Sequence, residues 1–152
     1  MRVLIAAMVL VGSGPGWAQA CPKPQDWAKP ERHLAARAPN MKFALKPGGV
    51  VQIGLLPQGA VRFAAGKATR QGHAGMAAID VPRAGTLQLS VSNKTFVDLV
   101  RGGKPLDLAG ETRERGCPGV QKTLAFKVTP GRYLVQFSGS PDRSVRIATS
   151  LR

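Results

Sequence analysis

The sequence has 152 residues, of which 43% are hydrophobic and 5% aromatic, and its 22 Lys and Arg against 8 Asp and Glu give a formal net charge of +14. This length suits one domain with a hydrophobic core of its own. The positive charge favours an anionic partner, whereas the few aromatic side chains available for base stacking argue against nucleic acid.

Residues 1–20, MRVLIAAMVLVGSGPGWAQA, have the three parts of a secretory signal peptide. Arg2 supplies the positive start, residues 3–11 form an apolar run too short to span a bilayer, and residues 18–20 form an A-x-A cleavage site. We therefore expect cleavage near Ala20 and a periplasmic or secreted protein without a transmembrane segment. A cysteine follows directly, but the residues before it match a lipobox poorly, so a lipoprotein anchored through that cysteine is the weaker alternative.

The two cysteines of the chain are Cys21 and Cys117. Exported compartments are oxidising, and an even cysteine count there fits a disulfide. No histidine or second cysteine stands near Cys117 in the sequence to activate it as a catalytic thiol. The sequence therefore predicts a Cys21–Cys117 disulfide that ties the start of the exported chain to its last third.

Residues 21–40 are predicted to form an N-terminal arm laid on the domain. They contain four prolines and little periodicity. The stretch ERHLAARA, residues 31–38, is interpreted as a short helical segment that ends before Pro39. Trp27 is expected to anchor the arm on the domain.

Residues 41–152 consist of short runs of alternating polarity separated by Gly and Pro turns, the pattern of an all-β domain. We predict a single jelly-roll-like antiparallel β-sandwich of about eight strands. The runs that carry this prediction are residues 41–45, 50–56, 60–65, 76–81, 86–92, 95–102, 103–110, 122–128, 132–138 and 143–151.

The alternation also predicts which side chains face the core. Gln136 is assigned to the face away from the core, where its replacement by Asp should be nearly silent, and Lys122 and Lys127 are expected to be exposed. The residues predicted to point inward are Leu87, Leu89, Val91, Leu124, Phe126, Val128, Tyr133, Val135 and Phe137.

The end of the chain resembles known exported proteins. The run TPGRYLVQFSG is similar to the last hairpin of bacterial pre-peptidase C-terminal domains, which are small jelly-roll sandwiches. A closer resemblance is to small exported bacterial proteins that share an early cysteine, here Cys21, with VDLVRGGKPL (97–106) and CPGVQKTLAFKVTPGRYLVQFSGS (117–140). That resemblance implies an exported β-sandwich with no known activity, although some members of the group carry the label homogentisate dioxygenase.

An enzyme is the alternative function, either that dioxygenase or an unrecognised hydrolase. A mononuclear iron oxygenase needs two histidines and a carboxylate that converge on adjacent strands, and the two histidines here, His33 and His73, are not in such an arrangement. The sequence lacks G-x-S-x-G and has no telling pair of carboxylates. No catalytic residue and no cofactor is therefore predicted.

Copper binding is a further alternative, because His73 and Met76 stand close together in HAGM, interpreted here as a Gly-rich loop. Imidazole and thioether ligands suit copper, and His33 or Met41 would have to complete the site.

The main functional hypothesis rests on charge. Around Cys117 the basic residues predicted to bind an anion are Arg101, Lys104, Arg113, Arg115 and Lys122. We expect an exported, non-catalytic binding or interaction module whose partners are anionic envelope polymers or lipid head groups. The competing interpretation is that the charge serves only solubility.

Overall fold

The computed structural model describes residues 21–152 except 23, 41, 67–69 and 114–116, so the predicted signal peptide and Arg115 lie outside the described residues. The elements are α1 (Pro24–Ala28), β1 (Glu31–Leu34), β2 (Ala44–Leu45), β3 (Val50–Gly54), β4 (Leu56–Pro57), η1 (Gln58–Ala60), β5 (His73–Val81), β6 (Gly85–Val91), β7 (Phe96–Arg101), β8 (Lys104–Pro105), β9 (Gly110–Arg113), β10 (Lys122–Val128), β11 (Gly131–Ser140) and β12 (Ser144–Leu151). No helix in this part of the chain is long and apolar enough to cross a membrane.

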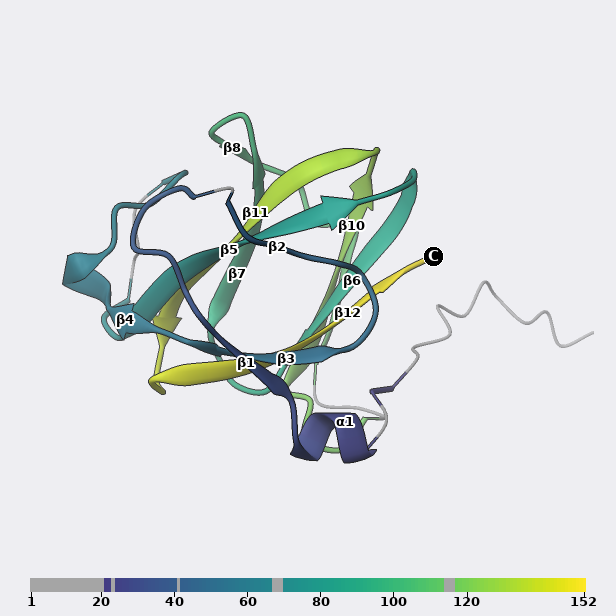
Figure 1. Ribbon diagram of the computed structural model, residues 1–152, viewed down its shortest axis with the longest axis horizontal. Coiled ribbons are helices and arrows are strands. Elements are labelled where there is room, and N and C mark those ends of the chain that lie inside the picture. The colour runs from purple at the N-terminus through teal and green to yellow at the C-terminus, as the bar shows by residue number, and fades with distance from the viewer. Residues whose placement is uncertain (1–20, 23, 41, 67–69, 114–116) are drawn as a thin grey trace, which may run out of the picture.

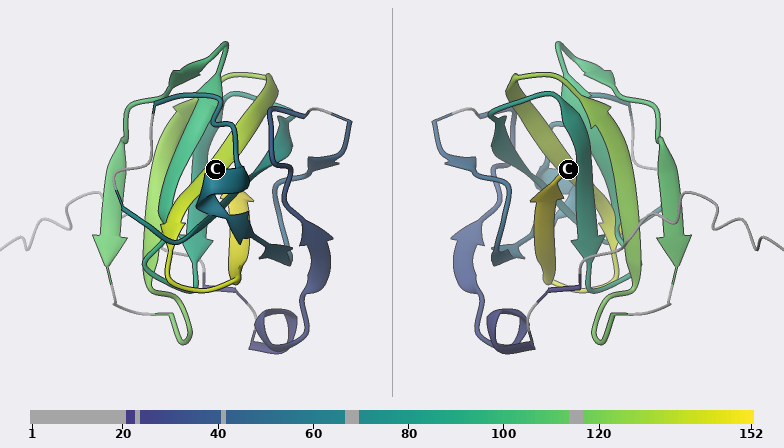
Figure 2. Two further views of the ribbon diagram at one scale, coloured as in Figure 1. Left: turned by 90° about the vertical axis from the view of Figure 1, so that its left-hand side faces the viewer. Right: turned by 90° about the vertical axis from the view of Figure 1, so that its right-hand side faces the viewer.

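Two sheets pack face to face, which confirms the predicted all-β sandwich (Figure 1). One sheet has the order β1-β3-β12-β6-β10-β9, and the other has the order β2-β5-β11-β7-β8 with β4 also paired to β5. The pairs β1–β3 and β2–β5 are parallel, and the other ladders are antiparallel. Figure 2 shows the N-terminal segment, in dark blue, along one side of the sandwich and β9, in green, along the opposite side.

The core lies between the sheets and contains every side chain predicted to point inward. Val135, Phe137, Leu87, Leu89 and Val91 are fully buried, and the other four are nearly so. The prediction that Lys122 is exposed is wrong, since only 8% of the residue is exposed. Lys127 is exposed, as predicted. Lys122 has the same parity along β10 as Leu124 and Phe126, so it points to the inner side of its sheet.

The run 60–65 is not a strand, contrary to the prediction. After η1 it crosses the outer face of the second sheet, where Ala64 and Ala65 cover Ala78, Val100 and Leu134. Gln136 holds it there: its Oε1 accepts hydrogen bonds from the Ala64 and Ala65 amides at 2.9 and 3.2 Å, and its Nε2 donates to the Ala65 carbonyl at 2.8 Å. Gln136 is therefore 2% exposed although it faces away from the core.

The arm differs from the prediction in its secondary structure. The helix is at Pro24–Ala28, and residues 31–34 form β1 instead of a helical turn. Pairing of β1 with β3 outweighs the weak helical preference of this stretch, and the chain continues as the Ala35 amide donates to the Gly54 carbonyl at 2.9 Å. Gly75 allows this path, because a Cβ at that position would collide with the Ala35 side chain.

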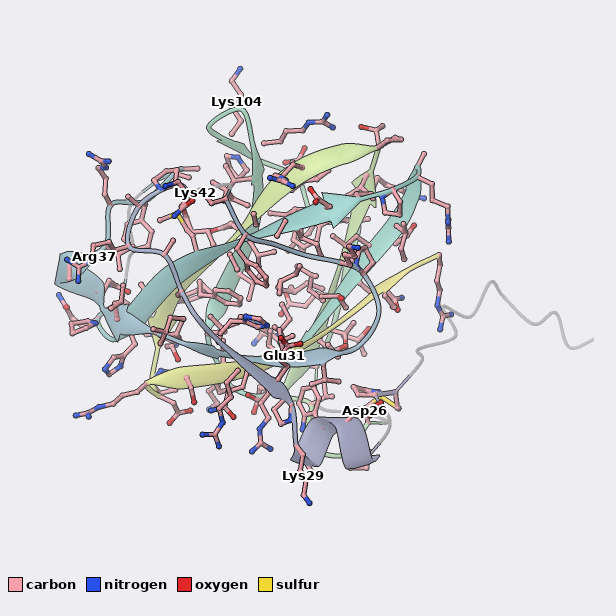
Figure 3. The ribbon with its side chains drawn as sticks, viewed as in Figure 1. Asp26, Lys29, Glu31, Arg37, Lys42 and Lys104 are labelled. Atoms are coloured by element: carbon pink, nitrogen blue, oxygen red, sulfur yellow. A yellow bond between two sulfur atoms is a disulfide. The ribbon has the colours of Figure 1, made fainter. Side chains whose placement is uncertain are left out.

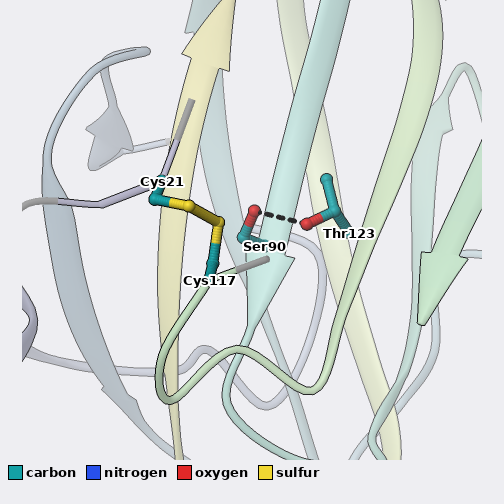
Figure 4. Close-up of a disulfide and its surroundings, with 4 residues drawn as sticks. All are labelled: Cys21, Ser90, Cys117 and Thr123. Atoms are coloured by element: carbon teal, nitrogen blue, oxygen red, sulfur yellow. Dashed lines mark hydrogen bonds between the residues drawn. A yellow bond between two sulfur atoms is a disulfide. The ribbon is translucent and has the colours of Figure 1, made fainter. Parts of the chain in front are cut away.

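The arm is fixed at its start by the predicted disulfide, in which the Cys21 and Cys117 Sγ atoms are 2.05 Å apart (Figure 4). Trp27 is 8% exposed, as expected for an anchor. Its indole packs so closely on Gly119 that no Cβ would fit there, and Gly119 has a φ of +77° that favours glycine. Cys117 and Gly119, which precede β10, are thus held against the N-terminal arm.

Candidate anion-binding site

The structure brings two of the predicted anion-binding residues together. Arg113 and Lys122 are direct partners in the ladder between β9 and β10. Arg101 and Lys104 pair with each other in the β7–β8 hairpin, at the other end of β7 from Phe96. Arg115 lies outside the described residues.

Arg101 is occupied by its own surroundings. Its guanidinium donates to Thr129 Oγ1 and Tyr133 Oη, both at 2.9 Å, and to the Pro130 carbonyl at 3.2 Å. The same group lies 4.8 Å from the centre of the Tyr133 ring. These contacts fasten the end of β7 to the β10–β11 turn, which is a structural role.

Lys104 is exposed in the β7–β8 hairpin. In Figure 3, Lys104, Arg37 and Lys29 project from the top, the left and the bottom of the molecule. Exposed cations therefore project from several sides of the sandwich, and a specific site would be a local concentration of them.

Such a concentration lines a hollow of about 390 Å³ at the edge where β7, β9 and β10 meet, called here the basic hollow. Its lining residues are Arg70, Lys94, Phe96, Arg113, Gln121 and Lys122. No sequence pattern pointed to Arg70 or Lys94, because the loop before β5 and the β6–β7 turn meet the β9–β10 edge only in the folded sandwich.

Phe96 forms the aromatic wall of the basic hollow and is 42% exposed. The Arg70 guanidinium carbon lies 4.6 Å from its ring centre and the Lys122 Nζ 5.6 Å, both within the range of cation–π attraction. Arg70 is held in place by the Gly139 carbonyl, at 3.1 Å from Nε and 2.7 Å from Nη2, and by the Lys94 carbonyl at 2.5 Å from Nη2.

Two carboxylates moderate the charge of the basic hollow. Glu111 is paired with Arg113, with 2.8 Å between Oε1 and Nε. Asp98 is half-buried, and burial raises the pKa of its carboxyl while Lys122 opposes the shift. Four cationic side chains therefore line a hollow with two carboxylates nearby, which leaves it positive.

Lys122 is the most perturbed cation of this group. Burial lowers the pKa of its ammonium, Arg113 and Arg70 lower it further, and Glu111 and Asp98 act in the opposite direction. The ion pairs found among the described residues do not include Lys122. The fold thus keeps an ammonium group at a site that disfavours its charge.

The copper hypothesis does not fit the structure. His73 and Met76 belong to strand β5 instead of a loop, and an odd spacing of three puts their side chains on opposite faces. The His33 ring stacks on the Phe43 ring with 4.6 Å between their centres, and His33 Nε2 lies 3.2 Å from Glu31 Oε1. Met41 is outside the described residues. Within the described ranges, no group of three or more His, Cys, Asp and Glu could hold a metal ion.

Comparison of the chain with protein-family models, with curated proteins and with solved structures finds no significant match. The resemblance to small exported proteins and to pre-peptidase C-terminal domains stays a prediction, as does the jelly-roll connectivity.

Proposed function

We propose that the protein is an exported, non-catalytic binding module that holds phosphate-bearing anions of the cell envelope in the basic hollow. Its ligands are the phosphorylated parts of envelope polymers or lipid head groups. The disulfide is compatible with an oxidising, exported environment, which is where such anions are accessible to a basic protein.

The observation that carries this proposal is the position of Lys122. Lys122 is 8% exposed as a residue, and burial together with its cationic neighbours lowers the pKa of its ammonium, so keeping the charge there costs free energy that a methionine of similar length would not cost. An anion in the basic hollow offsets that cost by lying between Lys122, Arg113 and Arg70. A surface charge kept only for solubility needs no such burial.

The chemistry of the lining suits phosphate. A guanidinium group can hold phosphate oxygens through parallel hydrogen bonds, and an ammonium group adds a point charge. Arg70 already donates from Nε and Nη2 to the Gly139 and Lys94 carbonyls, so it contributes mainly positive charge. Arg113, at the end of β9, and Lys94, in the β6–β7 turn, are both exposed, so they can meet a ligand in the hollow from two different segments of the chain. The exposed ring of Phe96 gives the ligand an apolar surface beside the charges.

A matched pair of double variants tests the proposal. Lys94→Ser with Arg113→Ser removes two charges from the basic hollow, and Arg62→Ser with Lys104→Ser removes two exposed charges elsewhere. The measurement is binding of the purified exported protein to lipopolysaccharide and to phosphatidylglycerol vesicles over a series of salt concentrations. We expect salt-dependent binding that falls at least about tenfold more in the first variant than in the second.

Equal losses in the two double variants would show that the attraction reflects net charge alone. Loss of lipopolysaccharide binding with unchanged vesicle binding would assign the hollow to the polymer phosphates, and the reverse result would assign it to lipid head groups.

A further inference from the structure

A groove of about 850 Å³ lies at the opposite edge of the sandwich from the basic hollow, between the N-terminal segment and the strands β3 and β4. We call it the apolar groove. Its apolar lining includes Leu34, Ala35, Ala36, Pro39, Leu55 and Leu56.

Backbone pairing holds the walls of the apolar groove in place. The Ala36 amide donates to the Met76 carbonyl at 2.8 Å, and the Met76 amide donates to the Ala36 carbonyl at 3.0 Å. On the other wall, the Leu55 amide donates to the Arg143 carbonyl at 2.7 Å. Gly54 leaves room for Leu34, because a Cβ there would lie 3.2 Å from Leu34 Cδ2.

The two most exposed of the large hydrophobic side chains in the described residues lie at this edge. Leu34 is 91% exposed, and Phe43, which lines an adjoining smaller cavity together with Leu34, is 57% exposed. An exposed leucine and phenylalanine beside an apolar groove leave apolar surface in water, and a ligand bound there would bury that surface.

The rim of the apolar groove is positive. Arg37, Lys42 and Arg143 line it, and its lining among the described residues contains no Asp or Glu. An apolar floor with three cations at its rim is complementary to a molecule that has an alkyl chain and an anionic head.

We propose that the apolar groove binds a single-chain amphiphile with a phosphate or carboxylate head. The alkyl chain lies along Leu34, Ala35 and Leu55, and the head meets the cations of the rim. A peptide fits less well, because Asn40, the uncharged polar side chain of the lining, already accepts a hydrogen bond from the Lys42 amide at 2.9 Å. The backbone groups of Ala36 are also paired.

Calorimetric titration of the purified exported protein with dodecyl phosphate, below its critical micelle concentration, tests this proposal. Butyl phosphate, dodecyltrimethylammonium and an acidic peptide are the comparison probes. We expect dodecyl phosphate to bind, and butyl phosphate and the cationic amphiphile to bind far more weakly. Stronger binding of the acidic peptide, or equal binding of the cationic amphiphile, would overturn the proposal.

The variant Leu34→Ser tests whether the amphiphile binds in the apolar groove. Leu108→Ser is the control, because Leu108 is also an exposed leucine, at 49%, and lies between β8 and β9 on the other edge. We expect Leu34→Ser to weaken dodecyl phosphate binding about tenfold and Leu108→Ser to leave it unchanged. Both substitutions are at exposed positions, so both variants should fold. Equal effects of the two would contradict the assignment.

The double variant Lys94→Ser with Arg113→Ser separates this site from the basic hollow. Because the phosphate of either alkyl phosphate can also meet the basic hollow, the quantity compared is the excess affinity of dodecyl over butyl phosphate. That excess should be unchanged in the double variant, while lipopolysaccharide binding weakens. Loss of the excess in that variant would place the alkyl chain in the basic hollow and overturn the present proposal without contradicting the first.

Discussion

Lys122 of β10 directs its ammonium toward the ring of Phe96 on β7, with 5.6 Å between Nζ and the ring centre. The two residues belong to different sheets, so this contact joins the sheets at the edge that carries the basic hollow. A ligand bound between them would touch both layers of the sandwich at once.

Lys122→Met is expected to stabilise the protein at neutral pH and to weaken anion binding about tenfold or more. Because burial holds the pKa of Lys122 below that of an ordinary lysine, the unfolded chain binds more protons between the folded and unfolded pKa values. The cost of the charge is fully present below the folded pKa and is relieved as the pH rises toward the unfolded pKa.

Urea unfolding of both proteins at neutral and alkaline pH checks this sign. The advantage of Lys122→Met should shrink as the pH rises, since the wild-type lysine loses its charge there. A variant less stable than the wild type at neutral pH would mean that the surroundings of Lys122 favour its charge.

Val135→Asp is expected to destabilise the sandwich by about 3–5 kcal/mol, because it puts an unpaired carboxylate at a fully buried position in β11. Thermal unfolding followed by circular dichroism measures the effect. Val135→Ala, which only removes volume, should cost less, and similar melting temperatures for the two variants would contradict the assignment of Val135 to the core.

Gln136→Ala should cost about 1–3 kcal/mol, since it leaves the amides of Ala64 and Ala65 and the Ala65 carbonyl without their partner. Gln136→Asp is no longer expected to be silent, because its shorter side chain has no donor for that carbonyl. Arg132→Ala, on the exposed part of the same strand, is a comparison at a surface position. Urea unfolding that shows no loss for Gln136→Ala would mean that residues 61–66 are not held by it.

Replacing both Cys21 and Cys117 by Ser is expected to lower the free energy of unfolding by about 4–5 kcal/mol at most, since the bond closes a loop of 96 residues. Chemical unfolding of the double variant against the wild type measures this difference. Thiol titration of the denatured wild-type protein should find no reactive thiol, and two free thiols would contradict the bond.

The parts of the fold that follow from period-two alternation were predictable, because strand side chains alternate whatever the tertiary arrangement. Strict alternation along residues 122–128 also predicts that Lys122 points inward, because it has the same parity as Leu124. The run 60–65 was not predictable, because a short apolar segment that covers the outside of a sheet has the composition of a strand within it. The strand at residues 31–34 was missed for a related reason, since it forms only by pairing with β3.

The basic hollow was half predictable. Arg113 and Lys122 flank the Cys117 loop, and a hairpin there brings them together through local pairing. Arg70 and Lys94 depend on how two distant connections cross the end of the sandwich, and no local pattern encodes that. Arg101 was grouped with Arg113 and Lys122 by its place in the sequence. In the structure it instead donates hydrogen bonds to Tyr133 and to the β10–β11 turn.

The position of β12 governs when this chain can fold. The last strand lies between β3 and β6, so the first sheet has a gap at its middle until residues 144–151 arrive. A chain whose residues 144–151 have not yet left the ribosome or a secretion channel therefore exposes the apolar faces of β3, β6 and β10. Deleting residues 144–151 should split the first sheet at its middle instead of fraying one edge, and a chain without them would depend on a holding chaperone until that strand closes the sheet.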